Sequence, residues 1–401
     1  MKKNVKSVPE IRFPGFTDLW ELRKVGEFAV ESCEKGHNGQ EALKLTVKLH
    51  TKGVCKMEEK GQGSDNTQYY VRHAGQLIYG KQNFFNGAIG IVPQSLDGYE
   101  STKDVPSFDI DDNVCVEWFY QYIARPEIYK SQEVNCTGTG SKRFHVNAFF
   151  DMNIPIPLIE EQKKISDYFK AIDNLITLQE QKCQALKRLK QCMLQKMFPK
   201  DGSDTPEIRF PGFTDSWEQR KVGELLIERN EQAPMNEEYP LMAFIANEGV
   251  APKGERYDRS SLVTDTENKL YKRTEFGDFI YSSNNLETGS IGLNKYGKAC
   301  ISPVYSIFHP TGIADSNFLG RRLVRKDFIN SMVKWRQGVI YGQWRIHESD
   351  FLKIEISVPS VKEQRQIGTF LDYLDNLITL SEKKCKVLKK LKQCMLQKMF
   401  V

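Results

Sequence analysis

The chain has 401 residues, of which 40% are hydrophobic and 27% are charged, a composition typical of a folded protein with more than one domain. No apolar run reaches membrane-spanning length and the N-terminal residues lack a signal-peptide core, so the sequence predicts a cytoplasmic protein with no membrane partner. The net charge of +5 is too small to indicate nucleic-acid binding by itself.

The nine cysteines and six histidines are scattered along the chain. No two cysteines form a CxxC pair, and the histidines show no metal-ligand spacing. We therefore expect free thiols and no metal site.

A repeated segment opens each half of the chain. Residues 9–27 read PEIRFPGFTDLWELRKVGE and residues 206–224 read PEIRFPGFTDSWEQRKVGE, which match at seventeen of nineteen positions with an offset of 197. Residues 199–205 (PKDGSDT) between the halves have the composition of a linker. The sequence is thus a tandem duplication.

The middle segments of the two halves, residues 28–135 and 225–336, share little sequence. Both contain short apolar runs bounded by turn residues, which predict strands at residues 76–80, 87–93, 278–282, 299–302 and 305–308. Helices are predicted at residues 118–123 and 328–335. Each half therefore contains a β-rich domain with some helix.

The halves converge again before their ends. GSKRFH at residues 140–145 aligns with GQWRIH at residues 342–347, with an offset of 202. Short predicted strands ending in proline follow at residues 154–157 and 356–359.

Residues 161–198 and 363–400 are each predicted to form one long helix. Both contain the blocks DNLITL and KQCMLQKMF, and each carries eight Lys/Arg against four Asp/Glu. An apolar stripe repeats every seven residues in each copy and predicts pairing of the two helices through Ile165, Ile172, Leu186, Met193, Ile367, Leu374, Leu388 and Met395. Two separate surface helices are the alternative.

This ordered and duplicated set of motifs resembles the specificity subunit of type I restriction–modification systems. The resemblance covers essentially the whole chain and implies an α+β fold with two target recognition domains, separated by two long helices that pair as an antiparallel coiled coil. On this basis residues 1–157 form the first recognition domain and residues 158–198 the central helix. Residues 199–359 form the linker and second domain, and residues 360–401 the C-terminal helix.

The resemblance also implies a function and partners. Each recognition domain would read half of a bipartite site on double-stranded DNA. Modification subunits would dock on the helices and methylate adenine with S-adenosylmethionine, and restriction subunits would supply an ATP-driven, Mg-dependent translocase and nuclease. No cofactor is implied for this chain. An adaptor whose two divergent domains bind proteins remains the alternative.

No catalytic motif stands out in the sequence. The chain lacks a GxxxxGK[ST] loop, an N-P-P-[YFW] or D-P-P-Y tetrapeptide, and an acidic nuclease core. We therefore predict a non-catalytic subunit.

Side chains suited to base edges and phosphates gather in four clusters, two in each half. We expect DNA contacts from Lys81, Gln82, Asn83, Asn86, Ser141, Lys142, Arg143, His145, Asn147, Ser282, Ser283, Asn284, Asn285, Gln343, Arg345 and His347. For Asn83, Asn284 and Asn285 the alternative is a left-handed turn conformation. Arg143 and Arg345 occupy matched positions, which favours a phosphate contact or an architectural ion pair over base reading.

Overall fold

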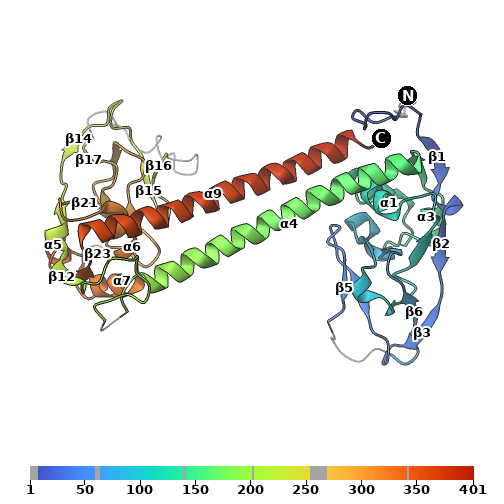
Figure 1. Ribbon diagram of the computed structural model, residues 1–401, viewed down its shortest axis with the longest axis horizontal. Coiled ribbons are helices and arrows are strands. Elements are labelled where there is room, and N and C mark those ends of the chain that lie inside the picture. The colour runs from blue at the N-terminus through green and yellow to red at the C-terminus, as the bar shows by residue number, and fades with distance from the viewer. Residues whose placement is uncertain (1–7, 59–63, 139–140, 201–202, 253–268, 341–342) are drawn as a thin grey trace. The chain divides into compact units, whose positions relative to one another are not determined.

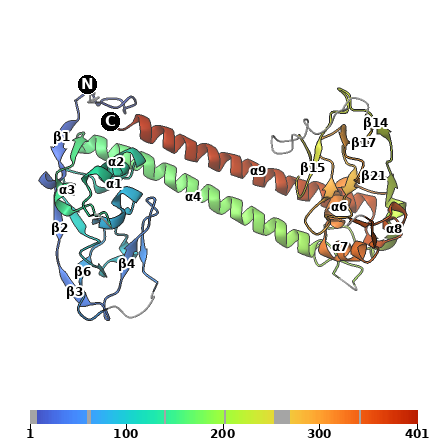
Figure 2. The same cartoon turned by 180° about the vertical axis from the view of Figure 1, so that it is seen from behind.

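The computed structural model describes residues 8–58, 64–138, 141–200, 203–252, 269–340 and 343–401. The chain divides into two compact units: unit 1 comprises Met1–Glu180 with Lys383–Val401, and unit 2 comprises Gln181–Glu382. The boundaries fall inside helices α4 (Ile159–Lys196) and α9 (Val361–Lys398), so each helix contributes one half to each unit (Figures 1 and 2). Each unit is described by itself.

Unit 1 is built mainly from short strands. The strands are β1 (Glu21–Lys24), β2 (Ala29–Ser32), β3 (Lys35–Asn38), β4 (Leu45–Val47), β5 (Val54–Lys56), β6 (Gln68–Arg72), β7 (Leu77–Tyr79), β8 (Ile89–Ile91), β9 (Tyr99–Ser101), β10 (Ser107–Ile110) and β11 (Asn153–Ile156). The helices besides α4 are η1 (Val25–Glu27), η2 (Lys81–Asn86), η3 (Gln94–Leu96), α1 (Val116–Ile123), α2 (Pro126–Ser131), η4 (Gln132–Asn135) and α3 (Val146–Phe150).

Two antiparallel sheets organise the globular part of unit 1. Their strand orders are β2-β10-β7-β8 and β3-β6-β9, and the pairs β1-β11 and β4-β5 complete the unit. All three residues of β7 are buried, and the core beside this strand is rich in aromatic rings. Burial of so many rings supplies much of the stability of the unit.

Unit 2 repeats this plan. Its strands are β12 (Glu218–Lys221), β13 (Leu226–Glu228), β14 (Gln232–Ala233), β15 (Ala243–Ile245), β16 (Gly249–Ala251), β17 (Tyr271–Thr274), β18 (Phe279–Tyr281), β19 (Ile291–Leu293), β20 (Ala299–Ile301), β21 (Ser306–Pro310), β22 (Gln337–Ile340), β23 (Gln343–Arg345) and β24 (Glu355–Val358). The helices besides α9 are α5 (Val222–Leu225), α6 (Ser316–Arg322), α7 (Lys326–Val333) and α8 (Glu348–Phe351).

The sheets of unit 2 follow the order of those in unit 1. Strands β13-β21-β18-β19 and β14-β17-β20 correspond to the two sheets of unit 1, and β12-β24 corresponds to β1-β11. The register is also shared, because Tyr79 pairs with Ile89 in unit 1 and Tyr281 pairs with Ile291 in unit 2. The predicted duplication of two β-rich mixed domains is therefore confirmed, although the middle segments share little sequence.

The repeated opening segment is fastened to the start of each long helix. In unit 1 the Arg12 guanidinium donates two hydrogen bonds to Glu161, at 2.9 and 2.7 Å, and Glu161 is only 1% exposed. In unit 2 Arg209 and Glu363 make the same two-pronged contact at the same distances. A planar guanidinium matches a carboxylate in this geometry, which explains the matched Arg and Glu of the two copies.

The glutamine that follows each of these glutamates is also buried. The Gln162 side chain accepts a hydrogen bond from the Cys115 backbone N–H at 2.8 Å and donates to the Pro157 carbonyl at 2.8 Å. Gln364 accepts from the Asp315 N–H at 3.0 Å and donates to the Pro359 carbonyl at 2.9 Å. In unit 1 the glutamine thus joins the start of α4 to the end of β11 and to the residue before α1. In unit 2 it joins the start of α9 to the end of β24 and to the residue before α6.

The identical ends of the two long helices insert into the aromatic cores. In unit 1 the Phe400 ring lies 5.9 Å from Phe169 and 6.1 Å from Trp118, centroid to centroid, beneath the Arg125 guanidinium. In unit 2 Phe198 lies 5.5 Å from Phe318, beneath Arg325. Each repeat therefore supplies the last aromatic residue to the core that the other repeat builds.

The two predicted long helices are confirmed, each starting and ending two residues earlier than the repeated sequence blocks. In the described part of the chain, no helix combines the length and apolar character needed to cross a bilayer. The stripe residues Ile165 and Ile172 are buried in unit 1 beside Met395, and Ile367 and Leu374 are buried in unit 2 beside Leu186 and Met193, while Leu388 is half-buried.

The two identical sequence blocks contact each other crosswise. In unit 1 Lys392, from the KQCMLQKMF block of α9, lies 2.6 Å from Asp173 of the DNLITL block of α4. In unit 2 Lys190 of α4 pairs with Asp375 of α9. Two further lysines, Lys187 and Lys389, also reach carboxylates of the opposite helix. Part of the lysine excess of the helices is therefore used in pairing them.

Candidate nucleic-acid interface

The structure brings together the two polar clusters that the sequence predicts in unit 1. Cluster residues Lys81, Gln82, Asn83 and Asn86 lie on η2, and the Phe144 N–H donates to the Lys81 carbonyl at 2.8 Å. The Gln82 side chain is hydrogen-bonded to the Ser141 hydroxyl. Residues about sixty positions apart in the sequence thus form one surface.

Unit 2 makes the same juxtaposition with different side chains. The Ser283 hydroxyl accepts a hydrogen bond from the Ile346 N–H at 3.1 Å, so the loop after β18 meets the segment that contains Arg345 and His347. Asn284 and Asn285 are exposed, whereas Ser282 is buried. The side chain of Gln343 lies outside the described residues.

The asparagines do not adopt the left-handed turn conformation that the sequence left open. Asn83 has φ −126°, and Asn284 and Asn285 are not among the described residues with positive φ. The Asn86 amide instead donates to the Asn83 side chain at 3.1 Å, which partly satisfies both groups inside η2. Asn284 and Asn285 keep exposed amides suited to hydrogen bonding with a ligand.

The matched arginines differ in their surroundings. The Arg143 Nε lies 3.5 Å from the Asp104 carboxylate, whereas Arg345 is 63% exposed and its nearest carboxylate, that of Glu348, is 3.9 Å away. Lys142 pairs with Glu133 at 2.7 Å. An architectural ion pair therefore describes Arg143 better than Arg345.

A cavity of about 300 Å³ opens beside this surface in unit 1. Three of the predicted contact residues line it: Lys81, His145 and Asn147. Arg72 and Lys103 line it as well, and sequence reasoning missed both of them. Lys103 is exposed, and its ammonium lies 5.7 Å from the centroid of the Tyr70 ring.

Arg72, the last residue of β6, is only 1% exposed. Its Nε donates to the Ser101 hydroxyl at 2.7 Å, and its Nη1 donates to the Ser107 hydroxyl at 3.0 Å and to the Ser32 carbonyl at 2.9 Å. Burial lowers the pKa of the guanidinium to about 10, so it still carries its positive charge at neutral pH. The signal in the sequence that could have identified Arg72 is a charged residue at the end of the strand QYYVR.

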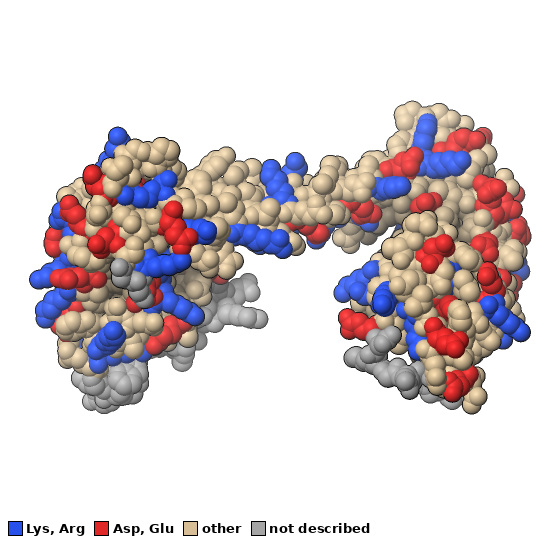
Figure 3. Space-filling model, turned by 60° about the horizontal axis from the view of Figure 1, so that its bottom comes forward, with Lys and Arg blue, Asp and Glu red and all other residues tan. Residues whose placement is uncertain are grey.

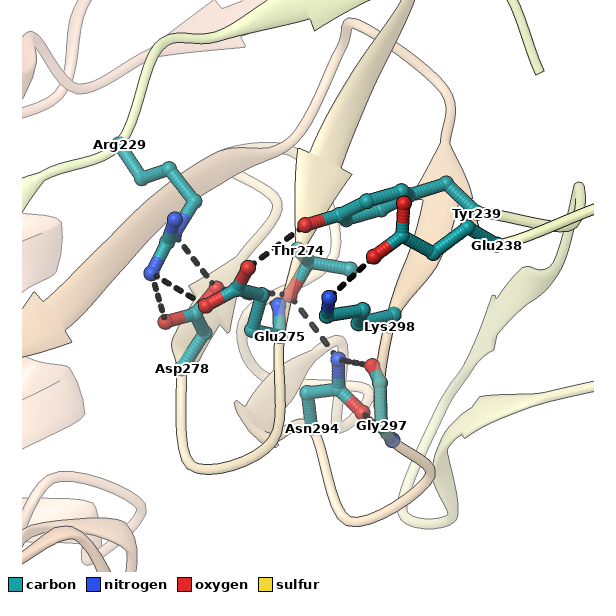
Figure 4. Close-up of polar contacts among 9 residues, drawn as sticks. All are labelled: Arg229, Glu238, Tyr239, Thr274, Glu275, Asp278, Asn294, Gly297 and Lys298. Atoms are coloured by element: carbon teal, nitrogen blue, oxygen red, sulfur yellow. Dashed lines mark hydrogen bonds and ion pairs between the residues drawn. The ribbon is translucent and has the colours of Figure 1, made fainter. Parts of the chain in front are cut away.

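In unit 2 the arginine that directly follows β13 is paired with carboxylates (Figure 4). Arg229, which directly follows β13, lies 2.9 Å from the buried Asp278 carboxylate and 3.3 Å from Glu275. Thr274 and the Glu275 N–H also donate to Asp278, and Tyr239 donates to Glu275 at 2.6 Å. Burial raises the pKa of Asp278 above its ordinary value.

The chemistry of these surfaces suits binding. Among the described residues, no group of three or more His, Cys, Asp or Glu is placed to hold a metal ion. Basic and acidic side chains are intermixed over the face of each unit that Figure 3 presents, so overall charge does not mark a ligand face. The local arrangement of polar loops and the unit 1 cavity is more informative than net charge.

Comparison with known families gives one match that spans much of the chain. A family model described as the type I restriction modification DNA specificity domain matches residues 105–188 and 214–390. The two matched stretches correspond to the two halves of the duplication.

Two relatives come from Methanocaldococcus jannaschii. The type I restriction enzyme MjaVIII specificity subunit is 23% identical over 346 residues, covering 80% of this chain and 74% of the relative. The putative type I restriction enzyme MjaX specificity subunit is 24% identical over 249 residues, covering 60% of this chain and 57% of that relative. The second match thus spans little more than half the length of the relative.

Two solved structures share the fold along nearly the whole chain. The HsdS subunit from Thermoanaerobacter tengcongensis superposes with a TM-score of 0.51 at 18% identity, covering 100% of this chain and 99% of that one. The S subunit of a type I restriction–modification system from M. genitalium gives a TM-score of 0.55 at 13% identity, with 98% and 99% covered. At these identities the likeness shows the fold alone.

Proposed function

The chain belongs to the type I restriction–modification DNA specificity family, and we propose that it reads a bipartite target on double-stranded DNA and directs partner subunits to it. It is a non-catalytic specificity subunit, as the relatives of the same family are named. Adenine methylation and DNA cleavage are assigned to the partners, with S-adenosylmethionine, ATP and Mg bound there. The chain acts in the cytoplasm.

One observation carries the proposal of two different half-sites. Both units bring the end of the central buried strand against the closing R-x-H segment, through the matched bonds from Tyr79 to Phe144 and from Tyr281 to Ile346. The side chains displayed there differ: Lys81 and Gln82 in unit 1 correspond to Ser283 and Asn284 in unit 2. A shared scaffold with different donors and acceptors suits the reading of different bases.

The predicted contact residues follow this division. Exposed Gln82, His145 and Asn147 are proposed to approach DNA from the first recognition domain, and Asn284 and Asn285 from the second. Lys142, Arg143 and Arg345 are proposed to position the phosphate backbone, because their charge suits phosphates in any sequence.

We infer that α4 and α9 form an antiparallel coiled coil that fixes the spacing between the two half-sites. The crosswise pairs Lys392–Asp173 and Lys190–Asp375 support an antiparallel order, since each joins an early block of one helix to a late block of the other. The functional segments are accordingly residues 1–157, 158–198, 199–359 and 360–401.

The helices also offer a docking surface for modification subunits. Tyr373, Leu380 and Val387 recur every seven residues on α9, with 59%, 64% and 63% of each residue exposed, and Leu178 on α4 is 61% exposed. An exposed apolar stripe at this spacing fits a partner helix.

The test is to purify the chain with the methyltransferase subunit of its own system and to map the adenines that the complex methylates. We expect a consensus of two short specified segments separated by an unspecified spacer of constant length. Methylation with no split consensus would refute the proposal. The protein-binding adaptor predicts instead that the complex shows no salt-dependent, sequence-selective affinity for DNA.

A further inference from the structure

We propose that the cavity of unit 1 lined by Arg72, Lys81 and Lys103 is a binding site for one phosphodiester group of the DNA backbone, and that the described residues of unit 2 do not repeat these three cations. The inference rests on the proposed DNA-reading function and adds two residues, Arg72 and Lys103, that the sequence did not identify. It assigns phosphate anchoring unequally to the two recognition domains.

The cavity has the size and the donors that an oxyanion needs. Its volume of about 300 Å³ is ample for a phosphate group. Lys81 is half-buried and Lys103 is exposed, so their ammonium groups can meet a ligand that enters from solvent. Tyr70 and the exposed Asn147 add polar wall, and Glu31 contributes one carboxylate to the lining. Three cations against one carboxylate leave the cavity positive.

Arg72 is the group that distinguishes this cavity from an ordinary surface hollow. Its Nε and Nη1 bond neutral oxygens of Ser101, Ser107 and Ser32, and Nη2 has no hydrogen-bond partner among the described residues. None of the carboxylates in the described part of the chain lies within ion-pair distance of it. Burying a charge is costly; the Glu31 carboxylate on the cavity wall offsets part of this cost, and an anion bound in the cavity would offset more of it.

The hydroxyl neighbours of Arg72 fit this role. A network in which Gln76 accepts from Ser107 at 2.8 Å and donates to Asp109 at 2.9 Å holds Ser107 in place. The guanidinium is therefore fixed in orientation without being neutralised. Such preorganisation lowers the entropy cost of binding.

Unit 2 lacks each of these cations at the corresponding position. Strand register and shared turn bonds match Arg72 with Thr274, Lys81 with Ser283 and Lys103 with Pro303. Arg229 of unit 2 is paired with Asp278 and Glu275 (Figure 4). Lys272, which matches Tyr70 in strand register, is buried as well, and its ammonium donates a hydrogen bond to the Tyr305 carbonyl at 3.1 Å.

A phosphate fits these donors better than a base edge does. Lysine ammonium groups and a fixed guanidinium attract a compact anion irrespective of sequence, whereas base reading needs amide or guanidinium groups that reach out into a groove. The cavity should therefore contribute affinity and salt dependence, while the exposed loops contribute the sequence preference.

The experiment measures DNA affinity of the complex with its methyltransferase subunit over a range of KCl concentrations, using the target defined by methylation mapping. The double variant Lys81→Ala, Lys103→Ala and the single variant Arg72→Gln should each make the negative slope of log K against log salt shallower by about 0.9, the value for one phosphate. The affinity deficit relative to wild type should then shrink about 3.5-fold between 50 and 200 mM salt. The methylated consensus should stay the same.

A matched control lies in unit 2. Lys298 packs on Tyr239 as Lys103 packs on Tyr70, but Lys298 is ion-paired with Glu238, so Lys298→Ala should leave the slope at the wild-type value. If Arg72→Gln fails to fold, the Lys81→Ala, Lys103→Ala double variant tests the phosphate site by itself. A second arm replaces single DNA phosphates by uncharged methylphosphonates: one position should weaken wild type but not the double variant.

The outcomes separate this inference from the proposed function. A wild-type complex that ignores the bipartite target contradicts the function itself. Selective wild-type binding with an unchanged salt slope in folded variants overturns only the phosphate site. A changed consensus in the variants would mean that the cavity reads bases. The absence of any discriminating methylphosphonate position would mean that the cavity holds a free anion and not the DNA backbone.

Discussion

Two matched strand positions in the layer beside β7 and β18 hold polar residues in unit 1 and apolar residues in unit 2. In unit 1 the strand positions opposite Tyr70 and Ile78 hold Ser101 and Ser107, which hydrogen-bond the buried Arg72. In unit 2 the equivalent positions, opposite Lys272 and Ile280, hold Ile301 and Ile307 of a compact hydrophobic cluster. One strand register thus accommodates either serine or isoleucine at these two positions.

The contacts that the two units share are the ones that define the fold. Register in both units is fixed by backbone bonds, by the pairing of the opening and closing strands, and by the aromatic cores. The layer that differs lies beside the proposed ligand surface and is not needed for that frame. Divergence in this layer can therefore change binding without changing the architecture.

The largest expected effect is a loss of stability when the aromatic residue after either long helix is removed. Phe400→Ala should destabilise unit 1, and Phe198→Ala should destabilise unit 2, each by about 3–5 kcal/mol, because a buried ring is removed and leaves a cavity. Hydrogen exchange of the buried amides of β7 and of β18 reports the free energy of opening of each unit.

The matched controls are Leu178→Ala and Leu380→Ala, which remove exposed apolar side chains at equivalent positions of the two helices. These should change stability by no more than about 0.5 kcal/mol. If Phe198→Ala weakened β7 more than β18, the crosswise contribution of each repeat to the other core would be wrong.

A smaller effect compares the two crosswise ion pairs. Lys392→Glu leaves Asp173 facing a like charge and should cost about 1 kcal/mol, within the range of partly exposed pairs. Lys190→Glu should cost about half as much, because Asp375 keeps its ion pair with Arg321. Denaturant unfolding at low and high salt measures both changes.

The reversed pair provides the control for this prediction. Asp173→Lys combined with Lys392→Glu should restore most of the lost stability, and 1 M salt should reduce all of these differences. Equal losses at the two sites would show that Arg321 does not support Asp375.

The smallest effect is a pH dependence expected in unit 1. Hydrogen bonding to the buried Glu100 carboxylate, 2.5 Å from its Nδ1, raises the pKa of His37. Because the folded-state pKa is the higher one, the stabilisation is complete below about pH 6.5, the unfolded value, and is lost as pH rises through the folded pKa. The described His–carboxylate ion pairs all lie in unit 1.

Hydrogen exchange of β6 amides as a function of pH checks this expectation. His37→Gln should reduce the pH dependence and leave the part that comes from His73, whose pKa is raised by its hydrogen bond to Glu34, and His145→Gln, at an exposed position of the same unit, should leave the pH dependence as it is. A steeper loss of stability toward acid in the wild-type protein would contradict the assignment.

Much of the architecture could be predicted because the chain repeats it. The identical blocks identified the long helices, and the apolar stripe identified their buried faces, since a heptad spacing is a local property of sequence. The short apolar runs located strands such as β7 and β18, because both are buried on both sides between turn residues.

The site was less accessible to sequence reasoning. The sequence predicts DNA contacts for both Gln82 and Ser141, but only the fold shows that their segments meet. Arg72 escaped notice because its burial depends on Ser101 and Ser107, which come from other strands. Asn83 and Asn86 bond each other, which sequence spacing alone could not distinguish from a ligand contact.

The buried glutamines at the helix starts make contacts that tolerate sequence changes in the globular domains. The side chains of Gln162 and Gln364 hydrogen-bond to backbone groups of the globular part of each half. Gln162 bonds Asn113, Cys115 and Pro157. Gln364 bonds Ile313, Asp315 and Pro359. Every residue type has a backbone carbonyl, and every type except proline has a backbone N–H. The hydrogen bonds of the two glutamines therefore do not depend on the identity of their partners' side chains. A foreign domain that preserves the backbone path could therefore keep the hydrogen bonds made by these glutamines.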